Sequence, residues 1–330
     1  AVSRLAIRAK EITGETRLCL AGGVALNCVA NGILQRSGVF EDIWIQPAAG
    51  DAGGALGAAL EVWNQSLSNK GINHAASLTL PESTGDDMNG SLLGPEYNEK
   101  EICEALGSFD AVYLRFDEGE LLDRVSELLE DGKIVGWFQG RMEFGPRSLG
   151  NRSILGDPRL VSLQSSINRK VKFRESFRPF APAVLEERSS EYFDLKGSSP
   201  YMLKVANVAE SQLKKVLDKE EEGFDRIKYE RSTIPAVTHV DGSARVQTVN
   251  KDQNPLFWKL LKCFESKTNC GVLLNTSFNV RGEPVVCTPE DAYRCFVNTS
   301  IDWLAIGPFL LKRGDQPEAK PQQEFDPIPD

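Results

Sequence analysis

The sequence predicts an α/β protein composed of two units. In both halves, strand-like segments alternate with segments of helical periodicity, which is the pattern of an α/β layer. Between about residues 69 and 97 the composition shifts to Ser, Gly, Asn, Pro and Asp, which indicates an interdomain linker. A chain of 330 residues, with 41% apolar and 26% charged residues, is long and apolar enough to form two cores.

The first unit is predicted to begin with a helix, because apolar residues recur at helical spacing across residues 1–14. A short strand in "RLCLAGG", a helix over about residues 25–35 and a second strand in "DIWIQP" follow. The glycine-rich turn "AAGDAGGALGAAL" then leads into another helix. This order is typical of a strand–helix–strand–helix layer.

The second unit starts near Lys100. Its predicted strands lie in "AVYLRF", "KIVGWFQG", "FAPAVL", "AVTHV", "ARVQTV", "GVLLNTSF" and "DWLAIG", and its predicted helices lie near 119–131, 160–169, 209–219, 254–266 and 288–297. We interpret "THVDGSARVQTV" as a hairpin around Asp241 and Gly242. Residues 218–226 are predicted to be a solvated charged segment, and residues 314–330 have too little apolar content to order themselves.

The composition excludes several classes of protein. A net charge of −9 and a pI near 5.1 argue against a general nucleic-acid binder, which needs a broad basic face. No apolar run approaches the ~18 residues of a membrane span, and no signal peptide opens the chain. The seven cysteines contain no C-x-x-C pair, which favours reduced thiols over a zinc cluster or disulfides. We therefore expect a cytoplasmic protein with no nucleic-acid or membrane partner.

A basic segment runs against this acidity. Residues 140–178 hold nine basic and three acidic residues, a net charge of +6, and Gly and Pro recur among them. Arginine binds phosphate or carboxylate through two parallel hydrogen bonds, and Gly lets backbone N–H groups approach an anion. A solvated surface stripe is the alternative, but the bases alternate with the mostly apolar "SFRPFAPAV". We therefore favour a phosphate pocket, with candidates Arg147, Arg152, Lys172 and Arg178.

Polar residues follow a predicted strand in "GVLLNTSFNVRGEP". Asn275, Ser277 and Asn279 lie at the carboxyl end of this strand, where open α/β sheets usually bind ligands. A turn that caps local backbone is an equally weighted alternative. Arg245 lies on a mostly apolar strand, where an unpaired charge would be costly, and joins the candidates.

The first unit has two glycine turns, each after a predicted strand. Gly22, Gly23 and Asn27 open one helix, and such a turn suits a nucleotide phosphate or ribose. The pattern is neither G-x-G-x-x-G nor a P-loop, so by itself it carries little weight. In the second turn, Gly50 precedes Asp51, whose carboxylate is a candidate metal ligand or a helix cap.

Together these motifs resemble the NodU/CmcH family of O-carbamoyltransferases. The matching segments are "LAGGVALNCVANG", "QPAAGDAGGALGAAL", "GRMEFGPRSLGNRSIL", "NRKVKFRESFRPFAPAV", "THVDGSARVQTV" and "LLNTSFNVRGEPVV", in family order across residues 15–312. The resemblance implies a C-terminal part of a Kae1-like domain of the actin/hexokinase superfamily at 1–68 and a linker at 69–97. It also implies a YrdC-like α/β domain with a twisted sheet at 98–313 and a flexible tail at 314–330.

The resemblance also implies a reaction. ATP and carbamoyl phosphate form carbamoyl-adenylate in the YrdC-like domain, and the Kae1-like domain passes the carbamoyl group to an acceptor hydroxyl. Arg147, Lys172 and Arg178 are the expected catalytic residues, with Arg152, Arg245, Asn275, Ser277 and Asn279 also in the pocket. Gly22, Gly23, Asn27 and Gly50 are the expected nucleotide ligands, with Mg²⁺ accompanying ATP. A homodimer is included among the expected assemblies.

The same resemblance implies an iron-type metal, for which Asp51 is the expected ligand. The family's other ligands are histidines from the first half of the Kae1-like domain, and this chain does not contain that half. We therefore interpret the sequence as a fragment that starts within a domain. We expect Arg147, Lys172, Arg178, Arg245 and Ser277 to converge on one pocket.

Other readings stay open. A carbamoyl-adenylate enzyme of tRNA modification or hydrogenase maturation uses the same intermediate, although the zinc-finger cysteines of the latter are absent. A noncatalytic nucleic-acid-binding module would use the 140–178 segment, but that segment lacks interleaved stacking aromatics. A sugar or acetate kinase of the actin superfamily would need a phosphate motif from the half that is absent. The identity of the acceptor does not follow from the sequence.

Overall fold

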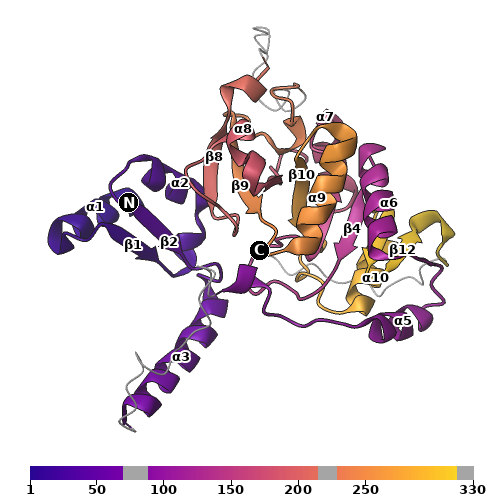
Figure 1. Cartoon of the computed structure of the whole chain (residues 1–330), viewed down its shortest axis with the longest axis horizontal. Helices are drawn as coiled ribbons and strands as arrows, with labels where there is room; N and C mark the ends of the chain where they lie inside the picture. Colours follow the sequence, from indigo (N-terminus) through magenta and orange to yellow (C-terminus); the bar gives the residue numbers. More distant parts are fainter. Residues whose placement is uncertain (70–87, 215–228, 318–330) are drawn as a thin grey trace. The chain divides into compact units, whose positions relative to one another are not determined.

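The computed structural model describes residues 1–69, 88–214 and 229–317, which divide into two compact units (Figure 1). Unit 1 comprises residues 1–93 together with 144–146 and 203–205, and unit 2 comprises the rest of the chain. His74, the charged segment 218–226, most of the predicted linker and most of the predicted tail lie outside the described residues.

Unit 1 is a small α/β layer around two parallel strands. Its elements are α1 (Val2–Thr13), β1 (Arg17–Leu20), the 3₁₀ turn η1 (Gly23–Leu26), α2 (Cys28–Arg36), β2 (Asp42–Ile45), α3 (Asp51–Asn69) and η2 (Asn89–Ser91). The strands pair from Arg17 with Asp42 to Leu20 with Ile45. Ile43 and Ile45 are buried while Trp44 between them is 40% exposed, so β2 alternates between a buried and an exposed face.

Unit 2 contains a mixed sheet in the order β3-β12-β11-β4-β5-β10-β6-β9-β8-β7. The strands are β3 (Leu114–Arg115), β4 (Val135–Phe138), β5 (Arg152–Gly156), β6 (Ala181–Leu185), β7 (Phe193–Asp194), β8 (Lys204–Val208), β9 (Ser243–Val249), β10 (Val272–Ser277), β11 (Trp303–Ile306) and β12 (Phe309–Lys312). β4, β5, β10 and β6 are successively antiparallel, whereas β9 runs parallel to β6. This sheet is separate from the β1–β2 pair.

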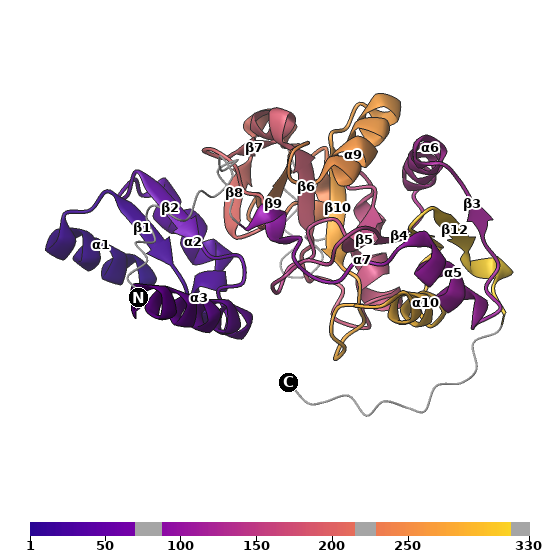
Figure 2. The ribbon, with the colours of Figure 1, turned by 60° about the horizontal axis from the view of Figure 1, so that its bottom comes forward.

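Helices cover both faces of this sheet (Figure 2). They are α5 (Glu99–Gly107), α6 (Glu118–Glu130), α7 (Val161–Lys170), α8 (Ser189–Tyr192), α9 (Pro255–Thr268) and α10 (Pro289–Val297), with 3₁₀ turns η3 (Glu186–Arg188), η4 (Glu210–Gln212), η6 (Pro235–Val237) and η7 (Arg313–Asp315). α6 and α9 lie on one face, and α5 and α10 lie on the other. β4, β5 and β6 are buried along their whole length because both faces are covered. This burial explains the near-continuous apolar sequences of β4 and β6.

Most predicted elements are present, but some predictions are wrong. "AVTHV" forms no strand: Pro235 begins the turn η6, and its ring removes a backbone donor that a sheet ladder would need. The predicted hairpin is therefore only a turn that enters β9, closed by the His239 N–H on the Ser243 carbonyl at 2.7 Å. β5, β7, β8, β12 and α5 were not predicted.

The fold class is confirmed as α/β with a mixed ten-stranded sheet. The Kae1-like and YrdC-like identities of the two parts stay predictions. Within the described residues, no helix combines the length and the apolarity that crossing a membrane requires.

Candidate functional site

The carboxyl end of β10 brings three of the predicted residues together. The Lys172 amine donates to the Asn279 side-chain oxygen at 2.7 Å, to the Asn279 carbonyl at 3.0 Å and to the Ser277 hydroxyl at 3.2 Å. It also donates to the Ser277 carbonyl. Lys172 lies two residues after the end of α7 and is 3% exposed, so its amine is enclosed by neutral oxygens.

Burial of the Lys172 amine shifts its pKa. Desolvation by burial, assisted by the charge of Arg174 and opposed by Cys295, lowers the pKa of Lys172 to about 7. A nearby phosphate would supply the negative charge that the enclosing oxygens lack. Binding of an anion by Lys172 at the end of β10 stays a prediction.

Arg174, two residues along the chain, is a cation that acts on Lys172. Burial lowers the pKa of Arg174, and the charge of Arg178 lowers it further. Glu175 lies among them: its pKa is lowered chiefly by a backbone hydrogen bond, and the charges of Arg178, Arg281 and Arg174 add to the shift. Arg178 is exposed and forms an ion pair with Glu175 at 3.2 Å. The sequence analysis missed Arg174, although it lies two residues after Lys172 in the same basic segment.

A second set of polar side chains meets above β6. Asn275 on β10 donates to the side-chain oxygen of Gln247 on β9 at 2.7 Å, although β6 lies between these strands. Asn275 pairs with Ala181 and Gln247 pairs with Ala183, and paired residues point to the same face. The two alanines leave the space in which the amides meet. Gln247 was not among the predicted residues.

These amides hold the loop that connects β4 to β5. Asn275 donates to the Ser148 carbonyl at 3.2 Å, and Gln247 donates to the Leu149 carbonyl at 2.7 Å. Asn254, the residue that caps α9, donates to the Asn151 side chain at 2.8 Å. Gly150 has φ +110°, and a Cβ there would lie 2.2 Å from the Phe257 ring, so only glycine fits.

Arg147 and Arg245 lie close in sequence to this braced region. Arg147 is half-buried in the β4–β5 loop and directly precedes Ser148. Arg245 is half-buried two residues before Gln247 on β9, and alternation places it on the same face as Gln247. Burial lowers the pKa of His239, and the charge of Arg245 adds to this shift. The convergence of all five residues on one pocket stays a prediction.

The structure places Arg152 apart from Asn275. Ser153 pairs with Ser277, so the preceding Arg152 points to the opposite face, where its guanidinium lies 3.6 Å from the Phe138 ring centroid. It is fully buried and donates to the carbonyls of Pro95, Gln139, Gly140 and Asn151. Burial lowers the pKa of Arg152 to about 10, and the carboxylate of Glu143 opposes the shift. The Arg152 guanidinium thus donates to backbone carbonyls, and its role in substrate binding stays a prediction.

The glycine turns of unit 1 lie at one edge of the β1–β2 pair. Both strands are parallel, so the turns that follow them are neighbours, and a Cβ on Gly50 would lie 3.5 Å from Leu26. Gly22 has φ +92° and directly precedes η1, which begins at Gly23. Asn27 caps α2 by accepting the Ala30 N–H at 3.0 Å, which gives it a structural function. Nucleotide binding by these residues stays a prediction.

Asp51 is the exposed first residue of α3, where a carboxylate interacts favourably with the helix dipole. Among the described residues, no group of three or more His, Cys, Asp and Glu side chains could hold a metal ion. A single carboxylate does not provide the several ligands of an iron-type site. The described residues therefore do not fit such a metal by themselves, and we assign no step to it.

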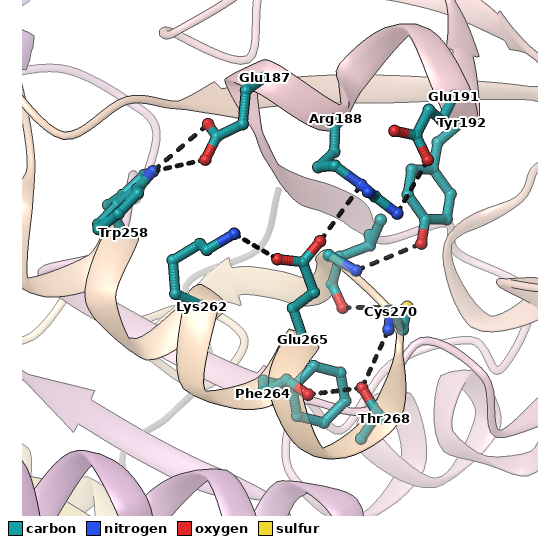
Figure 3. Close-up of polar contacts among 12 residues, drawn as sticks. Glu187, Arg188, Glu191, Tyr192, Trp258, Lys262, Phe264, Glu265, Thr268 and Cys270 are labelled. Atoms are coloured by element: carbon teal, nitrogen blue, oxygen red, sulfur yellow. Dashed lines mark hydrogen bonds and ion pairs between the residues drawn. The ribbon is translucent and has the colours of Figure 1, made fainter.

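A charged cluster occupies the other end of β10 (Figure 3). Glu265 on α9 accepts from Lys262 at 2.5 Å and forms an ion pair with Arg188 at 3.2 Å. The Tyr192 hydroxyl accepts the N–H of Gly271, which directly precedes β10, at 3.3 Å. Burial raises the pKa of Tyr192 to about 12. The cluster joins α8 and α9 to the sheet and is remote from Ser277.

Two family models match parts of the chain. A family model described as carbamoyltransferase C-terminus matches residues 126–313, which include the Lys172 site and the β4–β5 loop. A second model, carbamoyltransferase N-terminus, matches residues 2–60, which include Asp51 and the glycine turns.

Three relatives illustrate the similarity. An uncharacterized protein of Synechocystis sp. is 53% identical over 98% of this chain and 52% of its own length. The nodulation protein NolO of Bradyrhizobium diazoefficiens is 43% identical over 92% and 50%, respectively. The 3'-hydroxymethylcephem-O-carbamoyltransferase of Amycolatopsis lactamdurans is 30% identical over 93% and 51%. The chain thus spans about half the length of these relatives. On these matches, the chain belongs to the NodU/CmcH family of carbamoyltransferases.

Proposed function

We propose that unit 2 forms carbamoyl-adenylate from carbamoyl phosphate and ATP. One water is consumed, and phosphate and pyrophosphate are released. The observation that carries this proposal is the buried Lys172 amine, which is held at the end of β10 by Ser277 and Asn279 and has Arg174 and Arg178 nearby. In a chain of net charge −9, this concentration of cations fits a compact polyanion.

The cations contribute by neutralising charge. Carbamoyl phosphate and the ATP triphosphate repel one another, and preorganised Arg and Lys side chains offset that repulsion where negative charge develops. Lys172 binds the phosphate as an ammonium ion, because the anion raises the pKa that burial had lowered. Arg147, on the loop braced by Asn275 and Gln247, supplies a bidentate contact to a second phosphate edge.

The activated carbamoyl group then passes to the hydroxyl of a small-molecule or oligosaccharide acceptor. The name of the Amycolatopsis relative specifies a 3'-hydroxymethylcephem, which has such a hydroxyl group. This second step belongs to the part of the family protein that contains Asp51 and the glycine turns. Mg²⁺ accompanies ATP in this proposal, and ATP, carbamoyl phosphate and the acceptor are the substrates.

The test is ATP–pyrophosphate exchange that depends on carbamoyl phosphate. Lys172→Ala and Arg147→Ala should each lower exchange by about tenfold to a hundredfold, since each removes a charge-assisted contact. Arg147→Lys should not restore activity, because an ammonium cannot bind two oxygens in one plane. Lys170→Ala is the matched control: this exposed lysine lies two residues from Lys172. Near-normal exchange in both alanine variants contradicts the proposal.

A further inference from the structure

Glu143 is a buried carboxylate within the basic segment and is not one of the phosphate ligands proposed above. It is 6% exposed and lies on the β4–β5 loop, four residues before Arg147. Burying a charge is costly unless hydrogen bonds and an opposite charge compensate it. The contacts of Glu143 therefore indicate what the burial achieves.

One oxygen of this carboxylate gathers three backbone donors. It accepts the N–H groups of Leu149 at 2.6 Å, Asn151 at 2.9 Å and Arg152 at 3.3 Å. These bonds close the chain between Glu143 and Arg152 into a compact loop, and Arg147 lies inside it. The carboxylate charge is balanced electrostatically by the buried guanidinium of Arg152. The second oxygen is buried and accepts no hydrogen bond within the described part of the chain.

Two other hydrogen bonds hold the β4–β5 loop on the carboxyl-terminal side of Arg147. Gln247 and Asn275 hold the carbonyls of Leu149 and Ser148. Glu143 holds the N–H groups of the same stretch from the inside of the loop. The two sets of bonds hold both edges of the peptide chain that directly follows Arg147, so they constrain the backbone from which its side chain projects.

We propose that Glu143 is a positioning residue for Arg147 in the binding of carbamoyl phosphate. The inference rests on the proposed function of Arg147. Glu143 touches no substrate. It fixes the backbone geometry from which the Arg147 guanidinium reaches a phosphate, and a displacement of about 1 Å at such a group is enough to cost a large factor in rate.

The test compares the KM for carbamoyl phosphate in single and double variants of the protein. Glu143→Ala should raise this KM about tenfold to a hundredfold, because the loop loses its three internal bonds. Glu143→Gln keeps an acceptor oxygen at the same place and should stay within about fivefold of the parent protein. In an Arg147→Ala background, Glu143→Ala should change the KM by less than about twofold, because the guanidinium that it positions is gone.

Glu265→Ala is the matched control. It removes a largely buried carboxylate with two ion pairs at the other end of β10 (Figure 3). It should lower the thermal midpoint like Glu143→Ala and leave the KM for carbamoyl phosphate unchanged. Equal KM changes in both variants would show that Glu143 acts only through general stability, and this would overturn the inference.

The double variant separates this inference from the proposed function. An additional tenfold loss on top of Arg147→Ala overturns the positioning of Arg147 by Glu143, while the role of Arg147 stands. If Arg147→Ala itself leaves the KM unchanged, both the pocket assignment and the inference are wrong.

Discussion

Replacement of Lys172 by Met should change how the stability of the protein depends on pH. The amine is 3% exposed, and its burial lowers the pKa of Lys172 from 10.5 to about 7. The unfolded chain therefore binds this proton more tightly than the folded protein does. Stability consequently rises with pH between about 7 and 10.5, as the unfolded chain loses that advantage. Lys172→Met removes the group and with it this contribution.

The magnitude follows from the two pKa values. Two pH units correspond to about 2.7 kcal/mol, and the half-titrated amine at pH 7 reduces the gain between pH 7 and pH 9 to about 2.3 kcal/mol. The parent protein should gain about this much more free energy of unfolding than Lys172→Met over the same interval. Other groups titrate alike in both proteins, so their contributions cancel in the comparison.

Urea denaturation at pH 7, 8 and 9 measures this difference. Lys170→Met, which replaces the exposed lysine at the end of α7, should keep the pH dependence of the parent protein. Parallel pH profiles for the parent protein and Lys172→Met would refute the reasoning. They would mean that the oxygens of Ser277 and Asn279 stabilise the ammonium enough to cancel the cost of its burial.

Three further outcomes are expected. At pH 8, the parent protein should take up close to one proton when it binds carbamoyl phosphate, and Lys172→Met should take up none. Calorimetry in two buffers of different ionisation enthalpy measures this uptake. Equal uptake in both proteins would contradict the role of Lys172. Gly150→Ala should destabilise the protein by about 2 kcal/mol or more, because its φ is +110° and its Cβ would overlap Phe257; an unchanged thermal midpoint would count against the loop geometry. In the whole protein, Asp51→Ala should abolish transfer to the acceptor while sparing ATP–pyrophosphate exchange, and equal loss of both activities would contradict a role of Asp51 confined to the transfer step.

The sequence predicts those elements whose local pattern and burial agree. β4 and β6 are continuous apolar runs and β10 begins with one, and all three were placed correctly, because strands covered on both faces need no alternation. β5 was missed because it begins with Arg152, whose charge is accommodated by the Phe138 ring, the Glu143 carboxylate and four backbone carbonyls. β7 contains two residues, which is too short for any periodic signal.

Some residues of the candidate site were likewise recognised from the sequence, and others were missed. Lys172, Ser277 and Asn279 were recognised by residue type at a strand end, and their hydrogen bonds are present. Glu143 and Gln247 were missed because their partners are backbone groups and an amide brought close only by the strand register. Sequence periodicity indicates which face a residue occupies, but not which distant strand lies beside it.

The side-chain hydrogen bonds that hold the β4–β5 loop have a consequence for folding kinetics. The bonds from Gln247, Asn254 and Asn275 to the β4–β5 loop join residues that are 98, 103 and 127 positions apart in the chain. Contacts of such long range form only after the entropy of closing the intervening chain has been overcome. Helices such as α6 and α9 can form earlier from local contacts, whereas the Arg147 loop acquires its shape when β10 and β9 dock on β6. Competence to bind phosphate should therefore appear in the last phase of refolding, after most of the helical signal has returned.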